Sequence, residues 1–400
     1  DYTATNGSSV VLAVGATVSD TVFVQSFSAF TLADHYNKTE ADTLLAAKLP
    51  LAGGTLTGDL NVPSVTASGI VSDAGGNVRA GRKNLILNGG FDVWQRGTTF
   101  SVVDNIYTTD RWLTEFGGFG AWTLSRSTDA PSGFGYSLDL DCTAADASPA
   151  VGDVLQLFHR LEGQDLQQLQ KGTSGAKSIT FSFWIKSNKI GNLQVNLRDA
   201  NSRIIGAVYT INVADTWEKK SITFAGDTSG VIANDNTTEL TIEFPIGTGT
   251  NYSSGSVPTA WETTSTADRN AGATINLADS TANYWRISGL QLELGSVATD
   301  FEHRSYGEEL ALCQRYFHKN GPFTDSLGYG YLPAYTDTYR HINYLWPVTM
   351  RATPSMSVTW NAGSNWTARW GSVNGANMYV NIGDNTTSVH LTSVTADAEL

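Results

Sequence analysis

The sequence has few charged residues and few cysteines, and it lacks long apolar runs. Charged residues make up 16% of the 400, and the cysteines are two, Cys142 and Cys313. Two cysteines so far apart form neither a metal-ligand spacing nor a disulfide framework. No apolar run reaches the roughly eighteen residues of a membrane helix, so we expect no membrane insertion. The net charge of −13 argues against nucleic acid as a partner, because phosphate binding needs clustered Lys and Arg.

Sequence motifs of catalysis are also missing. There is no nucleophile elbow, no H-E-x-x-H, no phosphate-binding loop and no dinucleotide fingerprint. A glycan depolymerase would need paired carboxylates, and the acids that could supply them are Asp139, Asp141, Asp199, Glu239 and Glu243. Nothing around these acids distinguishes them from solvated strand faces and turns. We therefore predict that the chain is not an enzyme and carries no catalytic residue.

What the sequence does contain is short apolar alternation, interrupted by Gly, Asn, Asp, Ser and Thr. This pattern is typical of an antiparallel β-sandwich. Its ends are NLILNGGFDVWQRG (84–97) and YWRISGLQLELGSVATDFEHR (284–304), which we expect to lie side by side. Five inner strands are predicted at 180–187, 193–199, 204–213, 218–226 and 239–247. Two loop-like insertions, at 143–151 and 248–276, are where a rigid sandwich would carry binding residues.

The chain as a whole predicts an all-β, modular molecule. Its segments are a small N-terminal β-unit (1–31), a short helix with a Gly/Thr-rich stalk or linker (32–83), a jelly-roll sandwich (84–304) and a small C-terminal β-sandwich (305–400). After Arg304 a short helix should lead into a strand. The helix that Thr39 could cap is marginal alone. It is either a surface helix of a monomer or one of three packed copies, and residues 49–80 are either a linker or a trimeric stalk.

Aromatic side chains are the remaining candidates for binding, because sugar rings stack on Trp and Tyr. Trp122 and Trp261 flank Gly- or Thr-rich loops. The C-terminal segment adds a dense group made of Trp360, Trp366, Trp370, Tyr335 and Tyr339. The alternative for all of these is a place in a core or a trimer interface. Four further tryptophans are expected to be structural, namely Trp94, Trp112, Trp184 and Trp285.

Five stretches, in their order along the chain, carry a resemblance to a known family. They are LADHYNKTEAD (32–42), LPLAGGTLTGDLNV (49–62), the opening and closing runs, and YGEELALCQRYF (306–317) with the final TADAEL (395–400). Together they resemble tail fibres and tail appendages of bacteriophages that contain a carbohydrate-binding-module-like jelly roll. Similar modules often hold calcium near their first and last strands, so the resemblance implies Asp92 and Glu293 as calcium candidates; no other cofactor is expected.

The resemblance implies a homotrimeric virion protein that attaches the phage to a host surface glycan. We expect assembly in the host cytoplasm, a location in the tail fibre, and contact with other tail or virion proteins through the N-terminus. Because the sequence begins at Asp1 without Met, we also expect an upstream anchoring segment. The alternative is a purely structural appendage or adaptor, and a glycan depolymerase is the third interpretation.

Overall fold

A computed structural model describes residues 83–321, 339–360, 366–381 and 391–400, with short stretches at 2–3, 11–12, 14–21, 23, 39, 72–73 and 76–77. The chain divides into two compact units, Asp1–Ser68 and Gly69–Leu400. Among the described residues, no helix is long and apolar enough to span a membrane.

In its described residues, the first unit has an antiparallel strand pair, β1 (Tyr2–Thr3) with β2 (Val11–Leu12). The second unit begins with another short pair, β3 (Ser72–Asp73) and β4 (Gly76–Asn77). Apart from these stretches, the predicted helix after Thr39 and the predicted stalk lie outside the described residues.

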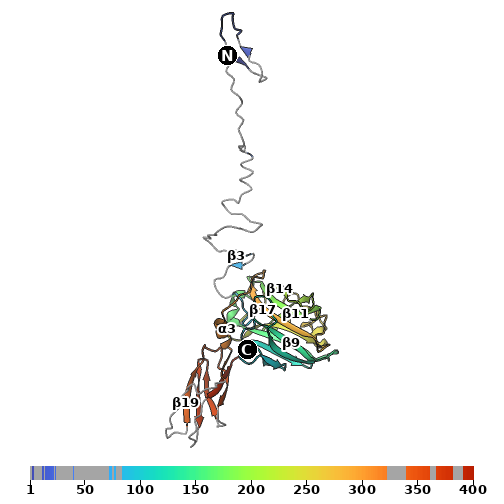
Figure 1. The fold of residues 1–400 in the computed structure, drawn as a ribbon, viewed down its shortest axis with the longest axis vertical. Helices are drawn as coiled ribbons and strands as arrows, with labels where there is room; N and C mark the ends of the chain where they lie inside the picture. The colour runs from blue at the N-terminus through green and yellow to red at the C-terminus, as the bar shows by residue number, and fades with distance from the viewer. Residues whose placement is uncertain are drawn as a thin grey trace. The chain divides into compact units, whose positions relative to one another are not determined.

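Two antiparallel sheets form the sandwich (Figure 1). The six-stranded sheet has the order β14 (Glu218–Phe224), β11 (Ile179–Ser187), β17 (Tyr284–Leu294), β9 (Ser137–Ala144), β8 (Ala121–Ser127) and β5 (Thr99–Ser101). The seven-stranded sheet has the order β16 (Glu262–Thr263), β13 (Arg203–Ile211), β12 (Gly191–Asp199), β15 (Thr238–Thr248), β10 (Val154–Glu162), β7 (Trp112–Gly117) and β6 (Ile106–Tyr107). The all-β prediction is confirmed, and each of the five inner strands lies within two residues of its predicted bounds.

The inward faces of both sheets meet in one hydrophobic core. At its centre the ring of Phe244 packs 5.3 Å from Phe183 and 5.6 Å from Trp285, both in edge-on geometry. Edge-to-face pairs of this kind add stability beyond the area they bury. Trp184 differs from the expectation: it is half-buried and lies outside this core cluster, because its strand neighbours Phe183 and Ile185 point inward instead.

The opening run is not a regular strand, although it does lie beside β17 as predicted. Leu85 donates to Leu292 (2.9 Å) and Leu290 donates to Gly89 (3.0 Å). Asn88 interrupts any ladder, since its φ of 55° is left-handed. The extended pairing therefore ends in a tight turn.

The C-terminal residues begin with helix α3 (Tyr306–Gln314) and β18 (Phe317–Asn320), in the predicted order. Ser305 caps the helix, because its side chain accepts from the Glu308 amide. Two three-stranded sheets follow, β18–β23–β20 and β19–β22–β21. The strands not yet bounded are β19 (Tyr339–Leu345), β20 (Ser355–Trp360), β21 (Trp366–Ser372), β22 (Gly375–Asn381) and β23 (Leu391–Asp397). Their shared core includes Tyr344, Trp346 and Val394.

Three of the motifs that carry the family resemblance, the opening run, 306–317 and 395–400, supply residues to one place between the sandwich and the C-terminal sheets. We call this cluster the joint; it consists of Asn88, Gln95, Arg96, Asp110, Arg111, Glu309, Tyr316, Phe317, Asp397 and Glu399. Asn88 binds both sides of the joint: its side-chain amide donates to Val93 (2.8 Å) and Asp110 (3.1 Å), and its backbone amide donates to Glu309 (2.5 Å).

Two arginines of the sandwich hold the last residues of β23 and those that follow. The side chain of Arg111 is 1% exposed, pairs with Glu399 and stacks 3.5 Å above the Tyr316 ring. Arg96 stacks 3.6 Å above Phe317 and lies 3.3 Å from a Glu399 oxygen. Because these cations are desolvated on aromatic faces, they need the Glu399 carboxylate as a partner. The joint therefore fastens the C-terminal sheets to the sandwich.

Candidate functional site

Trp122 is a core residue, which corrects the expectation that it binds sugar. Only 2% of it is exposed, its ring stacks on Phe119 at 6.3 Å, and its indole N–H donates to the Phe119 carbonyl (2.8 Å). No face of the ring is left for a ligand. The reason lies in β8, where Trp122 and Leu124 alternate with polar residues and so both point inward.

The C-terminal aromatic group remains a prediction. Tyr339 lies on β19, Trp360 on β20, and Trp366 and Trp370 on β21. Their backbone is among the described residues, but their side chains are not. Tyr335 lies outside the described residues altogether.

The two calcium candidates have separate surroundings. Glu293 is buried, and its carboxylate accepts from the Thr299 amide (2.9 Å), the Thr299 hydroxyl (2.7 Å) and Gln291 (2.8 Å). Burial raises the pKa of the Asp92 carboxyl, with a smaller effect of the same sign from Glu309. Across the described part of the chain, no three His, Cys, Asp or Glu side chains gather as a metal site would require. The Glu293 carboxylate therefore already accepts hydrogen bonds from donors of the protein itself.

The long polar insertion at 248–276 folds down onto the outer face of the seven-stranded sheet. It contains α2 (Thr250–Ser253), β16 and a 3-10 turn at Thr266–Asp268. Arg269 reaches across the face to Gln156 on β10 (2.7 Å) and to Glu243 on β15 (3.1 Å), and its carbonyl accepts from Asn196 on β12 (2.7 Å). Glu243 is 0% exposed as a result. The expected open binding loop is instead a cover over polar side chains of the sheet.

Three of the five acids considered for catalysis face cations. Asp139 accepts from Arg286 (2.7 Å), Asp199 pairs with Lys171, and Glu243 lies 2.7 Å from Arg198 as well as beside Arg269. Burial raises the pKa of Asp139 to about 6, although Arg286 opposes the shift. Each of these three carboxylates therefore has a cationic neighbour, although for Asp139 burial outweighs the cation.

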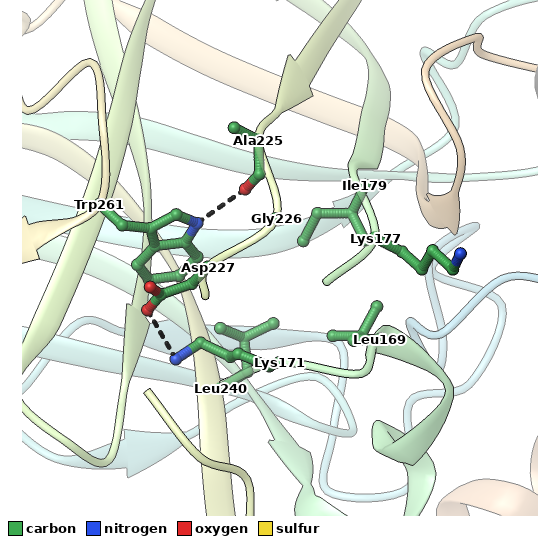
Figure 2. A pocket seen from close by; sticks show the side chains of 9 residues that line it. All are labelled: Leu169, Lys171, Lys177, Ile179, Ala225, Gly226, Asp227, Leu240 and Trp261. Carbon is green, nitrogen blue, oxygen red and sulfur yellow. Dashed lines mark hydrogen bonds and ion pairs between the residues drawn. The ribbon is translucent and has the colours of Figure 1, made fainter. Parts of the chain in front are cut away.

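Trp261, in contrast, lies half-buried at the edge of the sandwich, beside a small partly open cavity (Figure 2). We call this cavity the Trp261 slot; it is lined by Leu169, Lys171, Lys177, Ile179, Ala225, Gly226, Asp227, Leu240 and Trp261. Ile179 belongs to β11 of one sheet and Leu240 to β15 of the other. The slot therefore opens between the two layers, and its floor is hydrophobic core.

The polar groups around the slot hold its wall in place. The Trp261 indole N–H donates to the Ala225 carbonyl (2.8 Å), and its own carbonyl accepts from Arg203 (3.2 Å). The Lys171 ammonium lies 4.9 Å from the Trp261 ring centroid and 2.9 Å from Asp227. Figure 2 draws the Lys171–Asp227 pair as a dashed line. Burial alone would raise the pKa of Asp227, but hydrogen bonds from Arg203 and Lys171 outweigh it and lower this pKa to about 2. Asp227 is thus a permanent anion that positions two cations.

Sequence reasoning selected Trp261 but missed the rest of the slot. Leu169 and Lys171 lie in a polar loop stretch, and their approach to Asp227 and Leu240 is non-local. No spacing in the sequence indicates it. The joint is different: all of its residues except Asp110 and Arg111 lie within the short motifs.

The sequence matches no protein-family model and no curated protein. Solved structures similar to it include the enzymatically active domain of tailspike protein 4 from bacteriophage CBA120, with 13% identity and a TM-score of 0.30. That match covers 53% of this chain and 21% of that chain. A family 11 carbohydrate-binding module from Clostridium thermocellum, complexed with a β-1,3-1,4-mixed-linked tetrasaccharide, has 14% identity and a TM-score of 0.26, covering 52% and 98%. A family 61 module in complex with β-1,4-galactotriose has 10% identity and a TM-score of 0.26, covering 53% and 99%. At these values the likeness carries no argument about function.

Proposed function

We propose that this chain is a bacteriophage tail fibre protein that attaches the virion to its host by binding a surface glycan. The observation that carries the proposal is the joint. Motifs that are far apart in the sequence, and that resemble those of phage tail fibres, supply side chains to one buried cluster. Chance matches of short motifs would not explain why their side chains meet in one cluster. A way of joining two β-modules that is common to phage tail fibres would explain it.

Binding is favoured over hydrolysis by the state of the carboxylates. A glycosidase needs two acids that flank one bond, with one of them free to accept or donate a proton. Asp139, Asp199 and Glu243 each face a cation in the described part of the chain. Among the candidates whose side chains are described, Trp261 is the aromatic residue at the surface, and aromatic faces with fixed polar neighbours suit sugar rings. We therefore infer an adhesin that is not an enzyme.

The proposed assembly is a homotrimer located in the virion tail fibre and assembled in the host cytoplasm. The N-terminal segment would connect to other tail proteins, and each chain would offer its own glycan site. Linked sites raise a weak single-site affinity by orders of magnitude. A trimer would therefore adhere firmly even if each site bound a sugar only weakly.

Two observations favour a second candidate, a structural appendage or adaptor. Trp122 is buried and the 248–276 insertion lies flat on its sheet, so two of the predicted binding features are used for packing. If the C-terminal aromatic rings are packed in the same way, fewer surfaces remain for a glycan. The same joint would then serve to hold a spacer rigid.

Glycan binding by the full chain separates these functions. The chain, first checked for folding and oligomeric state, is applied to bacterial surface polysaccharides, and every hit is examined for shortened products. Saturable binding without shortening is the expected result. Shortened products would replace the adhesin with a depolymerase, and no binding by a folded trimer would favour the structural appendage.

A further inference from the structure

The Trp261 slot is too small for a sugar ring but has room for one small group. Its cavity volume is about 10 Å³, which is near the minimum for one water-sized group. Its floor is made of Leu169, Ile179 and Leu240, which are almost fully buried. The group that fits best is therefore small and apolar.

A hydroxyl group would fit this floor poorly. The polar atoms at the border already have partners: the Trp261 N–H binds Ala225, and the Lys171 ammonium binds Asp199, Asp227 and the Gly230 carbonyl. A buried hydroxyl would lose its bonds to water without gaining others here, which is unfavourable. A methyl group loses no such bonds and removes apolar surface from water.

The Trp261 side chain beside the slot is already held in one orientation. Trp261 is fixed at both ends, through its indole N–H to Ala225 (2.8 Å) and through its carbonyl from Arg203 (3.2 Å). A wall that is already ordered loses little conformational freedom on binding. Trp261 is half-buried and lines the partly open slot, so a pyranose could rest against it while a substituent enters the slot.

We propose that the Trp261 slot takes the methyl group of a methyl-bearing sugar: the C6 methyl of a 6-deoxyhexose or the acetyl methyl of an N-acetylhexosamine. The ring of that sugar lies against Trp261. This inference rests on the proposed glycan binding and names the sugar class that the site selects. One methyl group in an apolar pocket is worth roughly tenfold in selectivity.

Saturation-transfer NMR on the full chain tests the proposal with matched sugars. The 2-hydroxyethyl glycosides of L-rhamnose and L-fucose, whose aglycone has no methyl group, are compared with those of L-mannose and L-galactose, which carry a C6 hydroxyl. The N-acetyl-D-glucosamine glycoside is compared with the D-glucose glycoside. We expect the strongest saturation on the methyl protons, and affinity about tenfold higher than for the matched sugar. The two arms show which kind of methyl enters the slot.

Two variants alter the slot, and a third is the control. Trp261→Ala removes the wall, and Leu169→Phe fills the slot; both should abolish the preference for methyl-bearing sugars. Trp217→Ala is the matched control, because Trp217 is also half-buried and its indole N–H donates to Asp129 (3.0 Å) at another part of the sandwich. It should leave the preference intact. Thermal unfolding verifies that each variant is folded.

The outcomes distinguish this inference from the proposed function. Equal affinity for matched sugars, or a preference that survives Trp261→Ala, overturns the slot as a methyl site. If the chain binds a host polysaccharide but none of these glycosides, the inference also fails while the adhesin stands. If the folded chain binds neither polysaccharide nor glycoside, both fail.

Discussion

The joint and the Trp261 slot are both clusters of charge and aromatic rings, but they differ in what surrounds the rings. In the joint, Arg111 covers Tyr316 and Arg96 covers Phe317, and Glu399 completes both pairs. In the slot, Lys171 lies near one ring, Trp261, and a small gap remains beside it. The first arrangement uses its aromatic surface for packing. The second leaves some of it for another molecule.

The recognisable motifs and the candidate binding surface therefore lie in different parts of this chain. Three of the short motifs contribute to the joint, and its rings Tyr316 and Phe317 are only 2% and 6% exposed. The candidate binding surface lies in a region with no recognisable motif. Variants of the two clusters should therefore act on different properties: unfolding for the joint and glycan affinity for the slot.

The largest expected effect on stability follows from Glu399→Ala. It leaves Arg111 buried without its carboxylate, and breaking a buried ion pair costs about 3–5 kcal/mol of unfolding free energy. Denaturant unfolding measures this loss. Asp397→Ala is the control, because the Asp397 side chain is 41% exposed although it too lies near Arg96 (3.2 Å). It should cost at most about 1 kcal/mol. Equal losses would show that Glu399 is not central to the joint.

Asn88→Ala should follow, with a loss of about 3 kcal/mol from several buried hydrogen bonds and an unfavourable backbone. Asn88→Gly removes the same side chain but accepts the φ of 55°. Its loss should therefore be about 1 kcal/mol smaller. The difference between the two variants, measured by denaturant unfolding, isolates the backbone contribution. No difference would mean that the turn relaxes when the side chain is removed.

These results also bear on what the sequence could predict. The alternation of apolar and polar residues predicted the inner strands correctly, because it depends only on which side of a strand faces the core. It also held the signal for Trp122, whose inward position follows from its spacing to Leu124. By contrast, the opening run depends on Asn88 and its partner Glu309, and the cover over the sheet depends on Arg269 and Glu243. Such pairings join distant residues, so no local pattern indicates them.

The pH dependence of the two regions should have opposite signs. Burial raises the pKa of Asp110 in the joint from 3.8 to about 6. Its contribution to stability is therefore full below about pH 4 and is lost as the pH rises through about 6. Asp227 at the slot has its pKa lowered to about 2, so its contribution is full above about pH 4 and is lost as the pH falls towards 2.

Unfolding at a series of pH values checks both signs. Asp110→Asn should remove part of the loss of unfolding free energy that occurs as the pH rises from 4 to 6. Asp139, whose pKa is also raised to about 6, contributes another part of that loss. Asp227→Asn should remove part of the loss between pH 4 and 2. Curves of the two variants that differ from wild type in the same pH range would contradict the assignment.

The smallest expected change is that of Trp261→Phe. It keeps an aromatic wall but removes the indole N–H that binds Ala225, which costs about 1 kcal/mol of unfolding free energy. Glycan affinity should fall only in part, because a phenyl ring still offers a face. A loss of stability as large as that of Glu399→Ala would mean that Trp261 belongs to the structure as firmly as the joint does.

The central claim, that the chain binds a glycan at Trp261 and uses its motif residues for structure, is tested most directly by one titration. A polysaccharide that binds the full chain is titrated into wild type and Trp261→Ala, and unfolding is recorded for both. We predict an affinity at least about tenfold lower for the variant, equivalent to 1.4 kcal/mol, while both proteins remain folded. Unchanged affinity in a folded Trp261→Ala chain would contradict the claim and place the binding surface elsewhere.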